Sequence, residues 1–140
     1  MTTRRAQQTH RNGELPLHAA LRACAQGIYA AEAGIDLLIN NGTWLLRKDF
    51  TKRFVHLDNS TLDDTALGDI DWAAAVKALN TGDLPCSGGE QSVLRLAASL
   101  ADGLPINLRD AVTGIDHRNV ELLVAAVLHA SGQQQTIQNP

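Results

Sequence analysis

The chain has 140 residues, of which 44% are apolar, and its 12 basic and 15 acidic side chains give a formal net charge of −3. A chain of this length can bury a core without disulfides or metals, and the apolar share excludes a wholly disordered protein. The acidic balance also excludes a protein that binds nucleic acid through an overall positive charge. Alanine and leucine occur 20 times each, which favours helices over sheets.

The sequence contains no sign of a membrane span, of secretion or of a metal centre. No stretch reaches 18 uninterrupted apolar residues, so we expect no membrane-spanning helix. Residues 1–13 lack the apolar run of a secretory signal. Cys24 and Cys86 form no Cys-x-x-Cys pair, so we expect no zinc, no redox site and no cofactor. These features predict a cytoplasmic protein with both thiols reduced.

The first predicted element is a long helix over residues 16–41, which follows a flexible tail at 1–14. Pro16 suits the first turn of a helix, and the pair Asn41-Gly42 suits its end. Along this helix, apolar residues recur at alternating spacings of four and three, a heptad seam formed by Leu17, Leu21, Cys24, Ile28, Ala31, Ile35 and Leu38. We therefore expect one long central helix, with Cys24 in the core.

A stripe of small residues accompanies this seam and contains Ala23, Gly27, Ala30 and Gly34. Glycine inside a helix costs about 1 kcal/mol relative to alanine, so two glycines need a structural reason. A stripe without large side chains allows a second helix to approach closely. These four residues are the candidate interface, either for a homodimer or partner protein or for another helix of the same chain.

The next segment is predicted to be a helix followed by a loop. Thr43 is expected to cap a helix that runs to about residue 56. Residues 57–69 contain four acids, no base and several turn formers, so they predict a loop or a short helical turn.

The C-terminal half contains four predicted helices, each preceded by a side chain that can accept a backbone N–H: 72–79 after Asp69, 87–102 at Ser87, 107–114 at Asn107, and one from Asp116 to about Gly132. In the last helix, the side chains expected to face inward are Val120, Leu123, Val124, Val127 and Leu128. No alternating pattern of useful length predicts a strand. The expected fold is all-α: a single domain at 15–132, a bundle of five or six helices with a long central N-terminal helix, and a flexible tail at 133–140.

The string Ser87-Gly88-Gly89-Glu90-Gln91 resembles the signature motif of ABC-type ATPases, which presents the head of a helix to a nucleotide phosphate. By this resemblance Asp110 would stand for the Walker B aspartate, and residues 113–116 for the loop that follows it. The chain contains no Gly-x-x-x-x-Gly-Lys-Ser/Thr loop to hold phosphates, and Ala111 stands where the family has its catalytic glutamate. The preferred interpretation is a capping box formed by Ser87 and Glu90, and the alternative is a catalytically inactive remnant of an ATPase signature.

A basic helix face is formed by Arg47, Lys48, Lys52 and Arg53. Together with arginines of the N-terminal tail, it would supply several phosphate contacts. These four residues are the candidate nucleic-acid contact; the alternative is an ordinary solvated face of an amphipathic helix.

Catalytic and metal-binding patterns are sparse. His117 and Glu121 stand one turn apart on a helix but have no obvious third ligand, and Glu32 and Asp36 lack the Glu-x-x-His partners of a di-metal bundle. Cys86 precedes a helix start without a histidine nearby to activate it. The sequence thus predicts no catalytic, cofactor or metal residues.

The leading functional hypothesis is a small non-catalytic interaction or regulatory module that acts through protein–protein contacts, homodimeric or with another protein. The first alternative is a nucleic-acid-associated protein that uses the basic face of the 43–56 helix. The second is an enzyme with a site that the sequence does not reveal.

Overall fold

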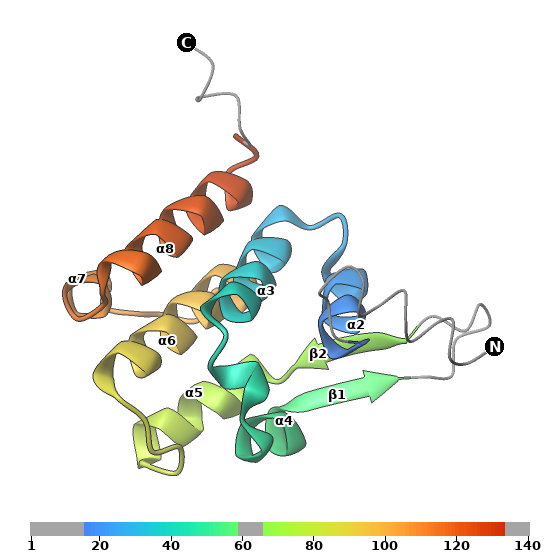
Figure 1. Ribbon diagram of the computed structural model, residues 1–140, viewed down its shortest axis with the longest axis horizontal. Helices are drawn as coiled ribbons and strands as arrows, with labels where there is room; N and C mark the ends of the chain where they lie inside the picture. Colours follow the sequence, from blue (N-terminus) through green and yellow to red (C-terminus); the bar gives the residue numbers. More distant parts are fainter. Residues whose placement is uncertain (1–15, 59–65, 134–140) are drawn as a thin grey trace.

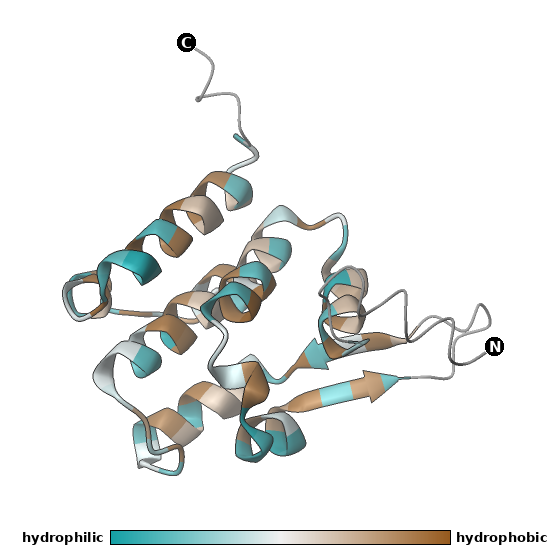
Figure 2. Ribbon diagram, viewed as in Figure 1, coloured by the Kyte–Doolittle hydropathy of each residue, from teal (hydrophilic) through white to brown (hydrophobic). Residues whose placement is uncertain are grey.

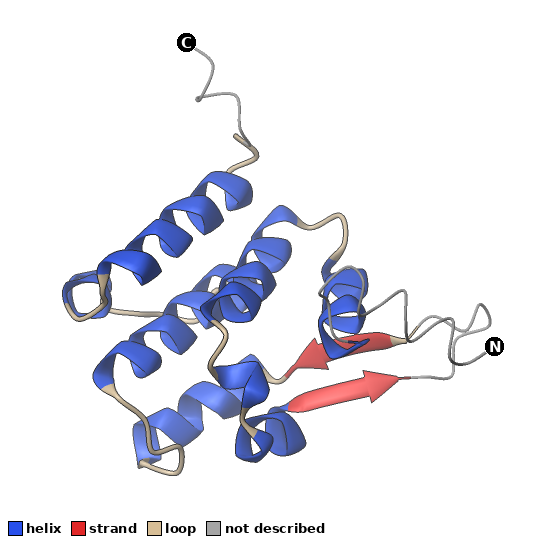
Figure 3. Ribbon diagram, in the orientation of Figure 1, coloured by secondary structure: helices blue, strands red, loops and turns tan. Residues whose placement is uncertain are grey.

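The computed structural model describes residues 16–58 and 66–133, which are mostly helical (Figures 1 and 3). The elements in chain order are α2 (Pro16–Ala25), α3 (Tyr29–Asn41), a short 3₁₀ helix (Trp44–Leu46), α4 (Lys48–Phe54), β1 (Val55–Asp58), β2 (Leu67–Ile70), α5 (Trp72–Thr81), α6 (Gly88–Asp102), α7 (Leu108–Thr113) and α8 (His117–Ala130). Helices therefore dominate as expected, but a small sheet is present as well. The predicted tails at 1–14 and 133–140 lie outside the described residues, apart from residue 133.

The predicted long helix over residues 16–41 is wrong, because the chain turns between α2 and α3. Gly27 has a φ of +94°, a conformation that is costly for residues with a Cβ and accessible to glycine. The Gly27 N–H donates to Oε2 of Glu32 at 2.9 Å, so the first turn of α3 holds the turn in place. The heptad seam is interrupted here: Cys24 and Ile28 are exposed instead of lying in the core.

The expectation that the chain has no strand is also wrong. β1 and β2 form an antiparallel pair in which Val55 is opposite Ile70 and His56 is opposite Asp69. A Cβ on Gly68 would lie only 3.3 Å from side-chain atoms of α2, so this glycine allows α2 to pack closely on β2. Each strand has only four residues, and β2, with the sequence LGDI, does not alternate apolar and polar residues, so the pair was not predicted.

The predicted helix over residues 43–56 is divided into the 3₁₀ helix and α4. Thr43 makes no side-chain capping bond, which is one reason why a longer helix does not start there. Trp44, Phe50 and Phe54 are buried, and adjacent ring centroids lie 5.4 Å apart. The Trp44 indole N–H donates to the backbone carbonyl of Glu90 at 2.9 Å, which ties this segment to the start of α6.

Helix α3 is the centre of the packing, with its most extensive contacts to α6 and α8 (Figure 1). A Cβ on Gly34 would lie 2.7 Å from both the Ala97 carbonyl oxygen and the Ala101 Cβ, so the backbones of α3 and α6 are close at this point. The largest fully buried side chains are Trp44, Phe50, Leu21, Leu37, Leu38, Leu94 and Val93.

The later helices begin close to where their capping residues predict. Ser87 Oγ accepts the Glu90 N–H at 3.1 Å, and a Glu90 carboxylate oxygen accepts the Ser87 N–H at 2.8 Å, which confirms the capping box. Asn107 and Asp116 likewise accept backbone N–H groups at the starts of α7 and α8. Asp71 caps α5, whereas Asp69, expected in that role, lies in β2.

Candidate functional site

The predicted interface residues do not form one continuous helix face. Ala23 is on α2, Gly27 lies in the turn, and Ala30 and Gly34 are on α3. Gly34 is buried against α6, so part of the stripe serves packing within the chain.

The predicted nucleic-acid residues are partly engaged inside the protein. Arg47 binds both carboxylate oxygens of Asp49, at 3.0 and 2.6 Å, and lies over the Trp44 ring. The hydrogen bond to Asp49 raises the pKa of the Arg47 guanidinium. Arg53 donates to a backbone carbonyl at 3.3 Å. Only Lys48 and Lys52 of the four are exposed without such contacts among the described residues, which leaves a small basic surface.

The groups considered for catalysis or metal binding remain dispersed. Burial raises the pKa of the Cys86 thiol, and the nearby charge of Glu90 raises it further, which disfavours a thiolate nucleophile. His117 and Glu121 lie 3.7 Å apart on the exposed side of α8. Within residues 16–58 and 66–133, no group of three or more His, Cys, Asp or Glu side chains is arranged to hold a metal. Asp110 is exposed in the first turn of α7.

The outer face of α8 carries a row of exposed apolar side chains. Val120, Val124 and Val127 are 37%, 53% and 50% exposed, and their spacing of four and three places them on one side of the helix. Figure 2 shows hydrophobic positions recurring along α8 between hydrophilic ones. The expectation that these three valines face inward is therefore wrong, since Ala126 is the buried residue of α8.

Polar contacts near both ends of α8 hold its inner face against α3. Arg118 donates to the backbone carbonyls of Asn40 and Asn41 at 2.6 and 3.3 Å. These carbonyls belong to the C-terminal turn of α3, where a cation is electrostatically favoured. At the other end, His129 Nε2 lies 2.7 Å from Oε1 of Glu32. The orientation of α8, and with it the exposure of its valines, is thus fixed by specific contacts.

Two adjacent hollows lie beside this row of valines. The first has a volume of about 480 Å³, and its lining includes Asp36, Asn40, Glu121, Val124 and Leu128. The second has a volume of about 420 Å³ and is lined by residues of α2, α3 and α8. They share Asp36 and His129, so we treat them as one feature, the α3–α8 groove. Ala23 of the predicted interface lines its second part.

Two polar pairs cross the middle of the α3–α8 groove. Arg22 forms an ion pair with Asp36, and Glu32 is bonded to His129. The hydrogen bond from the Gly27 N–H lowers the pKa of Glu32, and the bond to His129 lowers it further. Burial raises the pKa of Asp36, an effect that the Arg22 charge only partly offsets.

The valine row was missed because α8 is apolar over a wide arc. Its sequence HRNVELLVAAVLHA has apolar residues at most positions after Asn119, more than one buried face requires. A helix of this kind is expected to be covered on more than one side. The large number of apolar residues in α8 indicated a second apolar face, but it does not show which of these residues the fold leaves exposed.

The chain matches no protein-family model, no curated protein and no solved structure. Its function is therefore inferred from its own geometry. Across the part of the chain that the structure describes, no helix has both the length and the apolar character needed to cross a bilayer.

Proposed function

We propose that this protein is a non-catalytic helical module that binds an amphipathic helix of a partner protein in the α3–α8 groove. The observation that carries the proposal is the exposure of Val120 and Val124, which line the first hollow of the groove, and of Val127, which follows them on the same side of α8. Exposed apolar side chains in a row beside a hollow are typical of interaction sites, and their helical spacing suits the apolar face of a second helix.

The charges of the groove favour a partner helix with basic residues beside its apolar face. Three carboxylates, those of Glu32, Asp36 and Glu121, line the two hollows against a single arginine, Arg22. Because Glu121 stands at the outer rim, a lysine or arginine of the partner can pair with it without being buried. We propose that the module acts in the cytoplasm, where Cys24 and Cys86 would stay reduced.

The other hypotheses have less support in the structure. A homodimer through the small-residue stripe loses one of its contact residues, because Gly34 already packs on α6. Nucleic-acid binding would depend mainly on Lys48 and Lys52, because Arg47 and Arg53 have partners within the chain. For an enzyme, the described residues offer no group of His, Cys, Asp or Glu side chains arranged to hold a metal ion.

The first test is binding of a designed peptide. The probe is a helical peptide of about 18 residues, long enough to be partly helical in water, with leucine at every third or fourth position and lysine at most others. We expect saturable binding in the micromolar range by titration calorimetry. Val124→Asp/Val127→Asp places charges in the apolar row, so it should weaken binding about tenfold or more.

Matched controls distinguish binding at this site from nonspecific hydrophobic binding. Leu46→Asp removes another apolar side chain, 69% exposed, from the 3₁₀ helix and should leave binding unchanged. A scrambled peptide of the same composition should bind much more weakly. Equal binding of the scrambled peptide, or of the double valine variant, would contradict the proposal. A dimer would contradict it as well. If the protein sediments at twice the 15.0 kDa mass of one chain, and the double valine variant sediments as a monomer, a second copy of the chain occupies the groove.

A further inference from the structure

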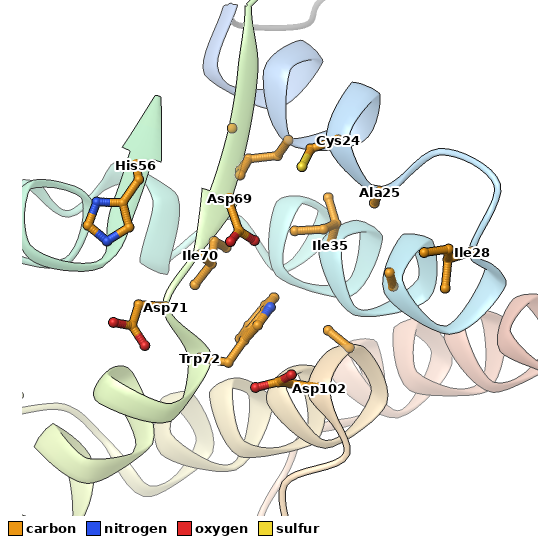
Figure 4. Close-up of a pocket in the computed structure, with 14 residues that line it drawn as sticks. Cys24, Ala25, Ile28, Ile35, His56, Asp69, Ile70, Asp71, Trp72 and Asp102 are labelled. Atoms are coloured by element: carbon orange, nitrogen blue, oxygen red, sulfur yellow. The ribbon is translucent and has the colours of Figure 1, made fainter. Parts of the chain in front are cut away.

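A second cavity lies between α2, α3 and β2 and has a volume of about 410 Å³ (Figure 4). Its volume is within the ~300–1,000 Å³ range of small-molecule sites. Its floor is apolar and closed, since the following lining residues are all less than a tenth exposed: Leu21, Ala25, Ile35, Ile70 and Trp72. We call it the α2–β2 cavity.

The rim of the α2–β2 cavity is acidic. Asp69, Asp71 and Asp102 line it, and His56 is the one basic side chain among its described lining residues. Asp71 is engaged as the cap of α5, where it accepts the Ala74 N–H at 3.1 Å. The side chains of Asp69 and Asp102 have no hydrogen-bond or ion-pair partner among the described residues. In Figure 4 these two carboxylates lie on opposite sides of the Trp72 ring.

The indole N–H of Trp72 is an independent sign of a ligand. Trp72 is only 7% exposed, and its Nε1 has no acceptor within the described ranges, whereas the Trp44 N–H donates to Glu90. In those ranges, every fully buried side-chain nitrogen or oxygen has a hydrogen-bond partner. Because the Trp72 N–H has none, it is not fully buried and must reach open space. Figure 4 shows the ring nitrogen at the end of the side chain that points toward Asp69 and Ile35, into the cavity. A donor held there by a buried ring is available to an acceptor on a bound molecule.

We propose that the α2–β2 cavity binds a small organic amine that carries an apolar body and an oxygen acceptor. The protonated amine lies near one of these two carboxylates, that of Asp69 or that of Asp102, the apolar body lies on the floor, and the oxygen accepts the Trp72 N–H. The face of the Trp72 ring adds a cation–π attraction to the same amine. This site does not depend on the α3–α8 groove, so either proposal can fail without the other.

The test uses the two tryptophan side chains as reporters in the full chain. The probe is 2-phenoxyethylamine, and the neutral control is 2-phenoxyethanol, which has a hydroxyl in place of the ammonium. In ¹H–¹⁵N spectra, the amine should shift the Trp72 indole signal saturably with a Kd of about 1 mM, as expected for so few atoms. The Trp44 signal should stay in place, because its N–H is bonded to Glu90. Trp72→Phe assigns the two signals.

The carboxylates are tested by a charge-matched pair of variants. Asp69→Asn/Asp102→Asn should weaken the amine at least tenfold, whereas Asp83→Asn/Asp110→Asn, which changes the net charge equally at exposed positions outside the cavity, should not. An unchanged Trp44 signal shows that each variant is folded. Equal shifts by amine and alcohol, no shift well above 1 mM, or full binding by the Asp69/Asp102 variant would each overturn the proposal.

Discussion

Glu32 and Asp36 lie one turn apart on α3, and their environments move the pKa values of the two carboxyl groups in opposite directions. The pKa of Glu32 is lowered by the hydrogen bond from the Gly27 N–H and by the contact with His129. The pKa of Asp36 is raised because burial disfavours its charged form more than Arg22 favours it. The ionised form of Glu32 therefore stabilises the fold, while ionisation of Asp36 opposes it.

This difference predicts opposite pH dependences for Glu32→Gln and Asp36→Asn. The contribution of Glu32 is present above its ordinary pKa of 4.5 and is lost as pH falls through the lower folded value. The contribution of Asp36 is present below its ordinary pKa of 3.8 and is lost as pH rises through the higher folded value. The free energy of unfolding is measured in urea between pH 7 and pH ~3.5. The loss caused by Glu32→Gln should become smaller as the pH falls. The stability of Asp36→Asn relative to the unchanged protein should increase as the pH rises toward neutral. Parallel pH profiles of the two variants would contradict this assignment.

At the scale of elements, the turn between α2 and α3 decides how the N-terminal half packs. The turn lets α2 cross β2 at Gly68, while α3 continues between α6 and α8. A continuous helix would instead carry residues 16–41 along one line. The α2–β2 cavity and the α3–α8 groove both depend on this change of direction, because α2 and α3 line both.

The substitution Gly27→Ala distinguishes the turn from a continuous helix by the sign of its effect. At a φ of +94°, alanine should lower the free energy of unfolding by about 1 kcal/mol or more. In a continuous helix the same change would raise it by about 1 kcal/mol. Gly88→Ala is the matched control, because Gly88 begins α6 with free space around its Cα and should be neutral or stabilising. Thermal and urea unfolding measure the stability of both variants. A Gly27→Ala protein that is more stable than the unchanged protein would refute the turn.

At the scale of the whole molecule, burial is unevenly distributed among the helices. Several buried side chains on each of α3 and α6 form the centre of the core. In α8 only Ala126 is buried, and polar contacts near both ends hold the helix in place. Elements with few buried apolar contacts open at lower free energy than the core does. The helix that carries the proposed binding row is thus less deeply buried than α3 and α6.

Native-state hydrogen exchange should resolve this hierarchy. Amides of α8 should exchange through a partial opening, at lower free energy than those of α3 and α6. Arg118→Ala removes two hydrogen bonds to α3, so it should accelerate exchange in α8 with little change in α6. Arg109→Ala on α7, an exposed arginine, is the control and should have little effect on either. Equal opening free energies for α8 and α6 would mean that the molecule opens as one unit.

Features that depend on neighbouring residues could be predicted from the sequence. The helix starts at Ser87, Asn107 and Asp116 were expected from the capping side chains, and the structure confirms them. The same local reasoning explains why the string at 87–91 is a capping box. Such bonds span only three residues along the chain, so no knowledge of the tertiary fold is needed to expect them.

Features that depend on distant parts of the chain were decided only by the tertiary structure. The spacing of Cys24 and Ile28 fits a continuous seam, but the positive φ of Gly27 and its bond to Glu32 end the helix there. The sequence by itself determined a mostly helical chain and the starts of its later helices, through periodicity and capping. Only the packing decided which apolar side of α8 is covered and where α2 meets β2, because burial depends on partners far apart in the sequence.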